Sequence, residues 1–456
     1  MQLGILKLWD SENTYSACLI VECFFCLHLM PQPQNSHTFH FMTLKSLLLV
    51  GGALLTGTAA SAGGYQVTLA GQKNNGMGGV GVGLSLDQAA MFYNPGALAM
   101  VKDRGVQVGV NLTMARNAFV AQGGSQQREL RNTVTTPFNL YAGFGPAEGK
   151  FRAGIAVYTP FGSKLQYAEG WEGRTALTDI DLKSIFVQPT VSYAITDQIS
   201  VGAGLVVLAY GAVNLQRDVP LPDSYGHIEL DGKADTKLGF NAGIFFKPSD
   251  KVSLGVNYRS KIDAHVKDGD VTFTGIPASF GTRFEATKFS ATLPLIATTS
   301  IGVGLMPTEK LTIGIDANFA QWSKYQSLRF DFDQQINGQT FSESKRNYKD
   351  ALTVRVGGQY KLTDGLTVRA GGAYDETPVR DGYVTPETPD NDRFSGTLGA
   401  SYSFGKFGVD VSAQYVSIQK RTETQQQLVN NGTTDRIAGT YKTNIVIPGI
   451  GLNYAF

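Results

Sequence analysis

Cysteine is scarce in this chain of 456 residues and confined to one end, where Cys18, Cys23 and Cys26 lie. Long hydrophobic runs are also missing: no run of about eighteen apolar residues occurs, which argues against a protein that crosses a membrane by helices. An excess of charge of one sign is absent too, because 39 basic residues face 38 acidic ones. This balance gives no electrostatic case for binding nucleic acid.

The segment that begins at Met42 has the pattern of a secretory signal peptide. Lys45 supplies a positive charge, Leu47 to Leu55 form an apolar stretch, and Ala60-Ser61-Ala62 matches a small-residue cleavage site. We therefore expect a signal peptide over 42–62, preceded by an upstream extension, 1–41, that comes from an earlier start codon and is not part of the mature protein. The alternative, a buried helix, is disfavoured by the short apolar stretch and the A-x-A pattern that follows it.

Cleavage at this site would change what the mature chain can do. All three cysteines would be removed, which excludes a disulfide framework and thiol chemistry. Basic residues would fall from 39 to 37 and acidic residues from 38 to 35, leaving a formal charge of +2. Of the five histidines only His227 and His265 would remain.

Glycine is abundant, with 53 residues in 456, against a usual frequency of roughly 7%. From about Val106 to Phe456, nearly every segment alternates apolar and small polar residues and ends in turn residues. The stretch 311–319 shows this period of two most clearly, with Leu, Ile, Ala and Phe on one face and Thr, Gly, Asp and Asn on the other. A soluble β-sandwich would show the same alternation, so strand length, strand number and loop lengths must separate the two.

The alternation predicts fourteen strands, at about 106–117, 136–146, 150–161, 183–196, 198–217, 232–247, 250–266, 288–307, 309–331, 346–361, 365–376, 393–404, 406–420 and 440–456. Short and long connections between them alternate strictly. An even strand number, tight turns on one side and long loops on the other are typical of single-chain outer-membrane barrels. The sequence therefore predicts an all-β protein, a fourteen-stranded antiparallel transmembrane β-barrel over 105–456, in the outer membrane of a Gram-negative bacterium.

The barrel hypothesis also predicts which side chains face lipid. In the strand at 346–361, Leu352, Val354 and Val356 share one face while Arg355 lies on the other. A charge facing lipid at mid-bilayer would cost about 2–4 kcal/mol, so Arg355 should point into the lumen. The final strand keeps its apolar phase up to Phe456, which resembles the signal that the outer-membrane insertion machinery reads.

Residues 63–104 follow neither a strand period nor a helical stripe. This stretch is rich in glycine and small apolar residues, and we expect it to form a compact N-terminal plug inside the barrel. Gly76-Met-Gly78-Gly-Val-Gly81 matches G-x-G-x-x-G in form, but no strand precedes it and no βαβ pattern surrounds it, which excludes a dinucleotide site. These glycines more plausibly let the plug backbone turn tightly and approach the wall.

Several short motifs resemble those of the FadL-type outer-membrane transporters, the family of long-chain fatty acid and aromatic hydrocarbon channels. They are Asn94-Pro95-Gly96, Thr159-Pro160-Phe161-Gly162, Trp171-Glu-Gly173-Arg174, Asp375-Glu-Thr-Pro378-Val379, Pro389-Asp390-Asn-Asp392-Arg393 and the terminal Asn453-Tyr-Ala-Phe456. They occur in the family's order from residue 63 to the end. Gly96 replaces the family's usual Ala, a change that gives the backbone more freedom.

The resemblance implies passive uptake of hydrophobic molecules, most plausibly long-chain fatty acids, through an outer groove, a lumen pocket and a sideways exit into the bilayer. It also implies that Asn94, Pro95 and Gly96 form a hinge in the plug. The implied partners are the hydrophobic substrate, outer-membrane lipid, lipopolysaccharide and, through Phe456, the barrel insertion machinery. No cofactor and no metal are expected.

Three sets of residues are candidates for the substrate path, each with a structural alternative. Val271, Phe273, Ile276, Phe280 and Phe284 would form the landing groove on an extracellular loop, or else pack on one another and on the loop at 218–231. Pro160, Phe161 and Gly162 would break the third strand and create the lateral opening, or Pro160 would simply end the strand. Arg217, Arg355 and Arg369 are candidates to bind a carboxylate, although lumen arginines more often pair with carboxylates such as Asp316 or Asp410.

A rival function is an outer-membrane lipid hydrolase with serine and histidine. Neither His227 nor His265 has a nucleophile motif beside it, and no metal spacing or paired-carboxylate arrangement is evident. A purely structural or adhesive barrel is a third possibility, but such a barrel would need no plug.

Overall fold

The computed structural model describes residues 64–131, 134–146, 149–433 and 436–456. The predicted signal peptide and the upstream extension lie outside the described residues. Within these ranges, no helix combines the length and apolarity needed to cross a membrane.

Fourteen antiparallel strands form one closed ring, as predicted. Many of them are divided by kinks into two segments, so the segments are numbered separately. In chain order they are β1 (Gly105–Asn111) with β2 (Thr113–Ala121); β4 (Val134–Thr135) with β5 (Phe138–Phe144); β6 (Phe151–Tyr158) with β7 (Gly162–Gln166); β8 (Asp179–Ala194); β9 (Ile199–Pro220); β10 (Tyr225–Lys233) with β11 (Lys237–Ser249); β12 (Val252–Arg259) with β13 (Ile262–Thr274); β14 (Lys288–Leu295) with β15 (Thr298–Leu305); β16 (Leu311–Ala320) with β17 (Ser327–Ile336); β18 (Gln339–Lys345) with β19 (Ala351–Lys361); β20 (Leu366–Asp375); β21 (Arg393–Phe404); β22 (Phe407–Glu423); and β23 (Gly439–Ala455).

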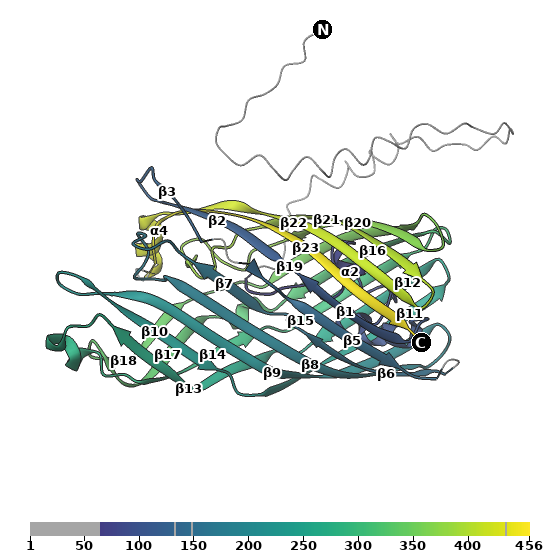
Figure 1. Ribbon diagram of the computed structural model, residues 1–456, viewed down its shortest axis with the longest axis horizontal. Helices are drawn as coiled ribbons and strands as arrows, with labels where there is room; N and C mark the ends of the chain where they lie inside the picture. The colour runs from purple at the N-terminus through teal and green to yellow at the C-terminus, as the bar shows by residue number, and fades with distance from the viewer. Residues whose placement is uncertain (1–63, 132–133, 147–148, 434–435) are drawn as a thin grey trace, which may run out of the picture. The chain divides into compact units, whose positions relative to one another are not determined.

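The ring closes between the first and last strands. β1 pairs with β23 from Gly105↔Ala455 to Asn111↔Gly449, and its other edge pairs with β5. Closure pairs the two terminal strands of the sheet with each other; left open in lipid, each of their unpaired backbone groups would cost several kcal/mol. Short turns and the C-terminus lie at one end of the barrel (Figure 1), which is the periplasmic end by the rule that periplasmic turns are short.

Alternate residues of the strands face lipid and lumen. In β1, Val106, Val108 and Val110 are exposed, whereas Gln107 and Gly109 between them, and Asn111 after them, are buried. Val354 and Val356 of β19 are likewise exposed, and Arg355 between them is not. The strands therefore present an apolar belt outward and polar groups inward, as a membrane barrel requires.

Some residues expected in extracellular loops are instead paired strand. β9 extends to Pro220 and β10 begins at Tyr225, so most of 218–231 forms a hairpin. β13 continues to Thr274 against β10. Long alternating sequences keep forming ladder hydrogen bonds after they leave the membrane, because nothing in the backbone changes at that point. Beyond these strands lie the short strand β3 (Gln127–Glu129), the 3₁₀ helix η3 (Ala278–Arg283) and the helix α4 (Gln425–Asn431).

Residues 64–104 contact inward-facing positions around the ring. Gln188 of β8 and Asn241 of β11 both donate to the carbonyl of Met91, and Ser412 of β22 donates to Gln72. The segment contains α2 (Gln72–Asn75), α3 (Ala90–Tyr93) and η2 (Pro95–Met100), and most of its side chains are buried. These contacts support an N-terminal plug, whose boundaries and function stay predictions.

Glycine permits the close approach of this segment to the wall. A Cβ added at Gly357 would lie 1.9 Å from the carbonyl oxygen of Met77, and one at Gly255 would lie 1.9 Å from that of Val82. Gly78 and Gly79 have φ of 73° and 82°, values that side chains disfavour. The glycine-rich motif is thus a site of backbone contact with the barrel wall.

Candidate functional site

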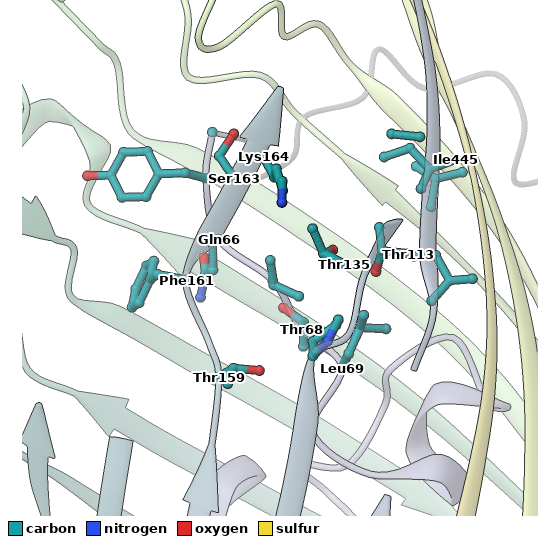
Figure 2. Close-up of a pocket in the computed structure, with 18 of the residues that line it drawn as sticks. Gln66, Thr68, Leu69, Thr113, Thr135, Thr159, Phe161, Ser163, Lys164 and Ile445 are labelled. Carbon is teal, nitrogen blue, oxygen red and sulfur yellow. The ribbon is translucent and has the colours of Figure 1, made fainter. Parts of the chain in front are cut away.

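A cavity of about 590 Å³ lies against the second, third and fourth strands. Its size falls within the range of about 300–1,000 Å³ that is usual for small-molecule sites. Figure 2 shows Gln66, Thr68 and Leu69 of the N-terminal segment between Thr159 to Lys164 on one side and Thr113, Thr135 and Ile445 on the other. The cavity is therefore bounded by the wall and by residues near the start of the described part of the chain.

The third strand is broken beside this cavity. β6 pairs with β5 only as far as Tyr158↔Asn139, and beyond it β7 pairs with β8 alone. Pro160, which lacks an N–H, lies in the interruption, and its carbonyl accepts from the N–H of Val67 at 2.8 Å. Gln66 forms an isolated bridge with Phe161. The predicted break at Pro160, Phe161 and Gly162 is present, and residues 65–67 occupy the position of the missing partner strand.

The lining of the cavity reaches both faces of the wall at this break. It includes Ser184, which is buried on the inner face of β8, and Lys183 and Ile185, which alternate with it and point outward. The side chain of Lys183 is 61% exposed. That the cavity opens sideways to lipid at Pro160, Phe161 and Gly162 stays a prediction.

A second cavity, of about 90 Å³, is almost entirely apolar. Leucine, valine, alanine and phenylalanine side chains from the fourth to the ninth strand line it, among them Leu208, Val213, Leu293 and Phe330. Tyr65, Phe161, Leu182 and Glu387 line both cavities. The two spaces therefore meet at Tyr65 in the middle of the lumen.

Of the three predicted arginines, the structure brings only Arg355 to a cavity. Its Nη2 lies 3.8 Å from Oδ1 of Asp375, and its side chain is 11% exposed. Arg369 is buried, donating to Gln359 and Ser401, and Ser401 in turn donates to Asp410. Arg217 lies on β9 and lines neither cavity.

Three further cations at the larger cavity, Lys183, Arg393 and Lys164, were missed by sequence reasoning. Arg393 pairs with Asp390 at 2.8 Å and donates to the carbonyl of Gly64. Lys164 lies on β7, with its Nζ 3.6 Å from Asp181. Arg393 belongs to the Pro389 to Arg393 motif, which was the signal available for it.

A buried ion pair covers the outer side of both cavities. Arg346 donates to Oε1 of Glu387 at 2.5 Å and to the hydroxyl of Thr385 at 2.9 Å. Burial opposes ionisation of Glu387, but the guanidinium of Arg346 outweighs it and holds the pKa of this carboxyl below its usual value. The loop that carries Glu387 is thereby fixed over the lumen.

Sequence comparison agrees with this geometry. A family model described as outer membrane protein transport protein (OMPP1/FadL/TodX) matches residues 53–456. The chain belongs to this family. It is 25% identical over 442 residues to the 47 kDa outer membrane protein of Pasteurella multocida strain Pm70, and 24% identical over 457 residues to the long-chain fatty acid transport protein of Escherichia coli O6:H1. Each alignment covers 90% of this chain and 98% of the relative.

Solved structures share the fold of this FadL-type barrel. The crystal structure of a Pseudomonas aeruginosa FadL homologue superposes with a TM-score of 0.75 at 22% identity, covering 86% of this chain and 100% of that one. The Pseudomonas putida toluene transporter TodX gives a TM-score of 0.63 at 14% identity, covering 87% and 99%. The protein is thus an outer-membrane channel for hydrophobic compounds, and the hydrolase alternative is wrong because the family consists of transport channels.

The Asn94-Pro95-Gly96 motif of this FadL-type channel is a fixed anchor in the structure. Asn94 is fully buried; its amide donates to the carbonyls of Val82 and Ile244, and its oxygen accepts from the N–H of Gly96. A Cβ at residue 96 would lie 2.7 Å from the carbonyl oxygen of Gly243, which explains glycine here. That the motif acts as a hinge stays a prediction.

The five apolar residues predicted to form the landing groove line neither cavity. Phe273 packs on Phe284 with ring centroids 5.3 Å apart, and Val271 pairs with Leu230 of β10. Ile276 and Phe280 pack against the same apolar cluster. This is the packing that the structural alternative anticipated, and a groove at this loop stays a prediction.

The remaining candidates lie apart from the cavities. His227 contacts Asp218 and Gln216, and His265 contacts Thr292. Within the described ranges, no group of three acidic, histidine or cysteine residues is placed to hold a metal ion. Phe456 lies beside Phe144 at the periplasmic end, and its recognition by insertion machinery stays a prediction.

Proposed function

We propose that this channel takes up long-chain fatty acids, holds them in the lumen, and releases them sideways into the bilayer between the second and third strands. The observation that carries the proposal is the larger cavity, whose lining reaches both faces of β8 beside the break in the third strand. A groove on the loop with Val271, Phe273, Ile276, Phe280 and Phe284 would be the first contact with the substrate.

The two cavities together suit an amphiphile. A fatty acid could lay its alkyl chain in the apolar space and place its carboxylate near Arg355, since charge-assisted hydrogen bonds are stronger inside a protein than at its surface. The 90 Å³ cavity is apolar, so a substrate that binds there needs no charged group. That cavity favours a second candidate substrate, a monoaromatic hydrocarbon, and among the structural relatives there are toluene transporters.

Below the cavities the lumen is blocked. Met77 and Val80 are fully buried, and Gly83 is packed on the backbone of Gly302. A straight path to the periplasm would require the segment 64–104 to move, whereas at the break in the wall the segment is held by the bridge of Gln66 to Phe161 and the hydrogen bond of Val67 to Pro160. This difference supports a sideways release.

Uptake by cells tests the proposal. A strain that lacks its own transporters of this family should take up radiolabelled oleate when it expresses this protein, and the same cells should be assayed with toluene. Oleate uptake equal to that of cells with an empty vector would overturn the fatty-acid proposal, and uptake of toluene alone would establish the second candidate.

A tryptophan in the gap tests the exit. Thr135→Trp should lower uptake because the indole would fill the space between β4 and β7. Ile301→Trp is the matched control, because Ile301 is 57% exposed on the lipid face of β15, away from the gap. Equal uptake by the two variants would count against release at this place.

A further inference from the structure

The wall has a second interruption, between the eighth and ninth strands. β15 pairs with β16 up to Thr298↔Ala320, and the ladder resumes at Ala291↔Phe330 between β14 and β17. Among the described residues, 292–296 and 322–329 share no backbone hydrogen bond across this stretch. The 3₁₀ helix η4 (Trp322–Lys324) is inserted on one side, and Pro294, which has no N–H, lies on the other.

Only side chains close this window, which we define as residues 292–296 and 322–329. Leu293 and Leu295 on one edge and Tyr325 and Leu328 on the other all line the apolar cavity. Trp322 is fully buried beside them. To open the window, apolar side chains must rotate, but no ladder hydrogen bond must break.

The window lies at the outer edge of the apolar belt. On the strands that border it, Ile301 and Phe319 are exposed toward lipid just below the interruption. Above it, the ion pair of Arg329 with Asp331 is about half exposed on β17. A molecule dissolved in the outer leaflet would therefore meet the window where hydrocarbon gives way to polar headgroups.

Tyr65 links the window to the break in the third strand. Its hydroxyl donates to the carbonyl of Pro294, which has no partner on β17. Its ring lies 5.0 Å from Trp322 on one side and 6.0 Å from Phe161 on the other. The window, the apolar cavity, the larger cavity and the gap at Phe161 thus follow one another across the lumen.

We propose that hydrophobic molecules dissolved in the outer leaflet reach the lumen sideways, through the window between β14 and β17. The class of substrate is an uncharged hydrocarbon or the alkyl end of an amphiphile, because the cavity behind the window is apolar. Where neighbouring strands of the ring are paired, sideways access would break ladder hydrogen bonds and expose unpaired backbone groups to lipid. This inference rests on the proposed uptake function but concerns a different part of the wall.

A reversible bridge across the window tests it. No cysteine occurs after residue 26, so Leu293→Cys with Leu328→Cys can be joined selectively by a bismaleimide whose spacer contains a disulfide. Cells in which the two cysteines are bridged should lose uptake of oleate and toluene. Reduction of the disulfide in the spacer should restore uptake in the same cells. If mass spectrometry verifies the bridge and uptake is unchanged, the proposed entry through the window is wrong.

A matched bridge separates the window from general stiffening. Ile301→Cys with Ala317→Cys joins a lipid-facing pair in the unbroken ladder of the same two strands, and this bridge should leave uptake unaltered. If cells without the bridge take up neither compound, the proposed uptake function is wrong. If they take up either compound and the window bridge does not lower that uptake, only the proposed entry through the window is wrong.

A single substitution gives an independent readout. Leu328→Trp should fill the window and lower uptake, while heat-modifiable migration of the barrel in gels shows that it still folds. Phe273→Ala probes the loop groove in the same assay. If Phe273→Ala lowers uptake and Leu328→Trp does not, the substrate enters at the loops, and the proposed entry through the window is wrong.

Discussion

The periplasmic and extracellular halves of the barrel are built differently although the same strands run through both. In the periplasmic half the ladders are continuous, and glycines of the wall, such as Gly302, Gly357 and Gly371, touch the backbone of the N-terminal segment. In the extracellular half two ladders are interrupted, and the inner face carries leucine, valine and aromatic side chains around cavities.

The difference between the two halves explains how a closed barrel can block free diffusion through its lumen and still let a substrate pass. Where backbone packs on backbone there is no room for a substrate. Protein interiors are so closely packed that even one added methyl group disturbs the packing. Interrupted ladders provide space and a route through the wall without opening the ring as a whole. The four predictions that follow test whether this division between the halves is real.

The largest effect is expected where the segment touches the wall. Gly357→Ala would place a methyl group 1.9 Å from the carbonyl oxygen of Met77, and overpacking of this kind costs about 1–3 kcal/mol. The loss of stability should appear in urea unfolding, with the folded fraction measured from the migration of the barrel in gels. Gly396→Ala is the control, since a Cβ there meets nothing within 4 Å; equal stability of the two variants would refute tight packing in the periplasmic half.

The next largest effect concerns the carboxylate that holds the segment. Oδ2 of Asp316 accepts from the N–H groups of Gly81 and Val82 at 2.7 and 3.0 Å. Asp316→Ala leaves two buried donors without a partner, a loss for which the expected cost is about 1–3 kcal/mol. Limited proteolysis should then cut within 64–104 more readily than in wild type, whereas Asp364→Ala in an exposed turn should change nothing.

A smaller effect separates the two candidate substrates in the extracellular half. Arg355→Gln should lower oleate uptake roughly tenfold, which corresponds to about 1.4 kcal/mol of a lost charge-assisted hydrogen bond. Toluene uptake by the same cells should stay unchanged, because toluene has no carboxylate. Lys361→Gln, at the exposed end of the same strand, is the matched control; a parallel fall in both uptakes would show that Arg355 acts structurally.

The smallest effect concerns the loop over the cavities and depends on pH. Because Arg346 depresses the pKa of Glu387, their interaction stabilises the loop at neutral pH and is lost as pH falls through that depressed value. The protection of residues 376–392 against hydrogen exchange, expressed relative to the slower intrinsic exchange rate in acid, should therefore fall as pH falls. Glu387→Gln should remove this pH dependence and leave exchange in the periplasmic half unaffected; an unchanged profile would show that the ion pair does not hold the loop.

Much of the wall could be predicted because its signals are local. Period-two alternation places each side chain on a known face once a strand is recognised, and the strand at 346–361 shows this with Arg355 inside and Val354 outside. Pro160 signalled a break in the ladder for a similarly local reason, the missing N–H. The interruption at Pro294 carried the same signal, but the alternation on both sides of it hid the insertion of Trp322 to Lys324.

The site was harder to predict because it depends on residues that are distant in sequence. Arg355 and Arg369 have the same type and the same phase, yet only Arg355 meets a cavity, since Arg369 is held by Gln359 and Ser401. The apolar loop residues read equally well as a groove and as packing. The packing of Val271 depends on its pairing with Leu230 of β10, a residue 41 positions earlier in the chain, which no local pattern indicates.

The number of strands, their faces and the side on which the turns are short can be predicted from the amino-acid sequence, because each follows from alternation and turn residues within a few positions. Where the lumen is filled and where it is open becomes clear only in the folded protein. That outcome depends on which wall glycines meet the N-terminal segment, contacts that join residues as far apart as Met77 and Gly357. It also depends on where neighbouring strands lose their pairing, which no period-two pattern reveals.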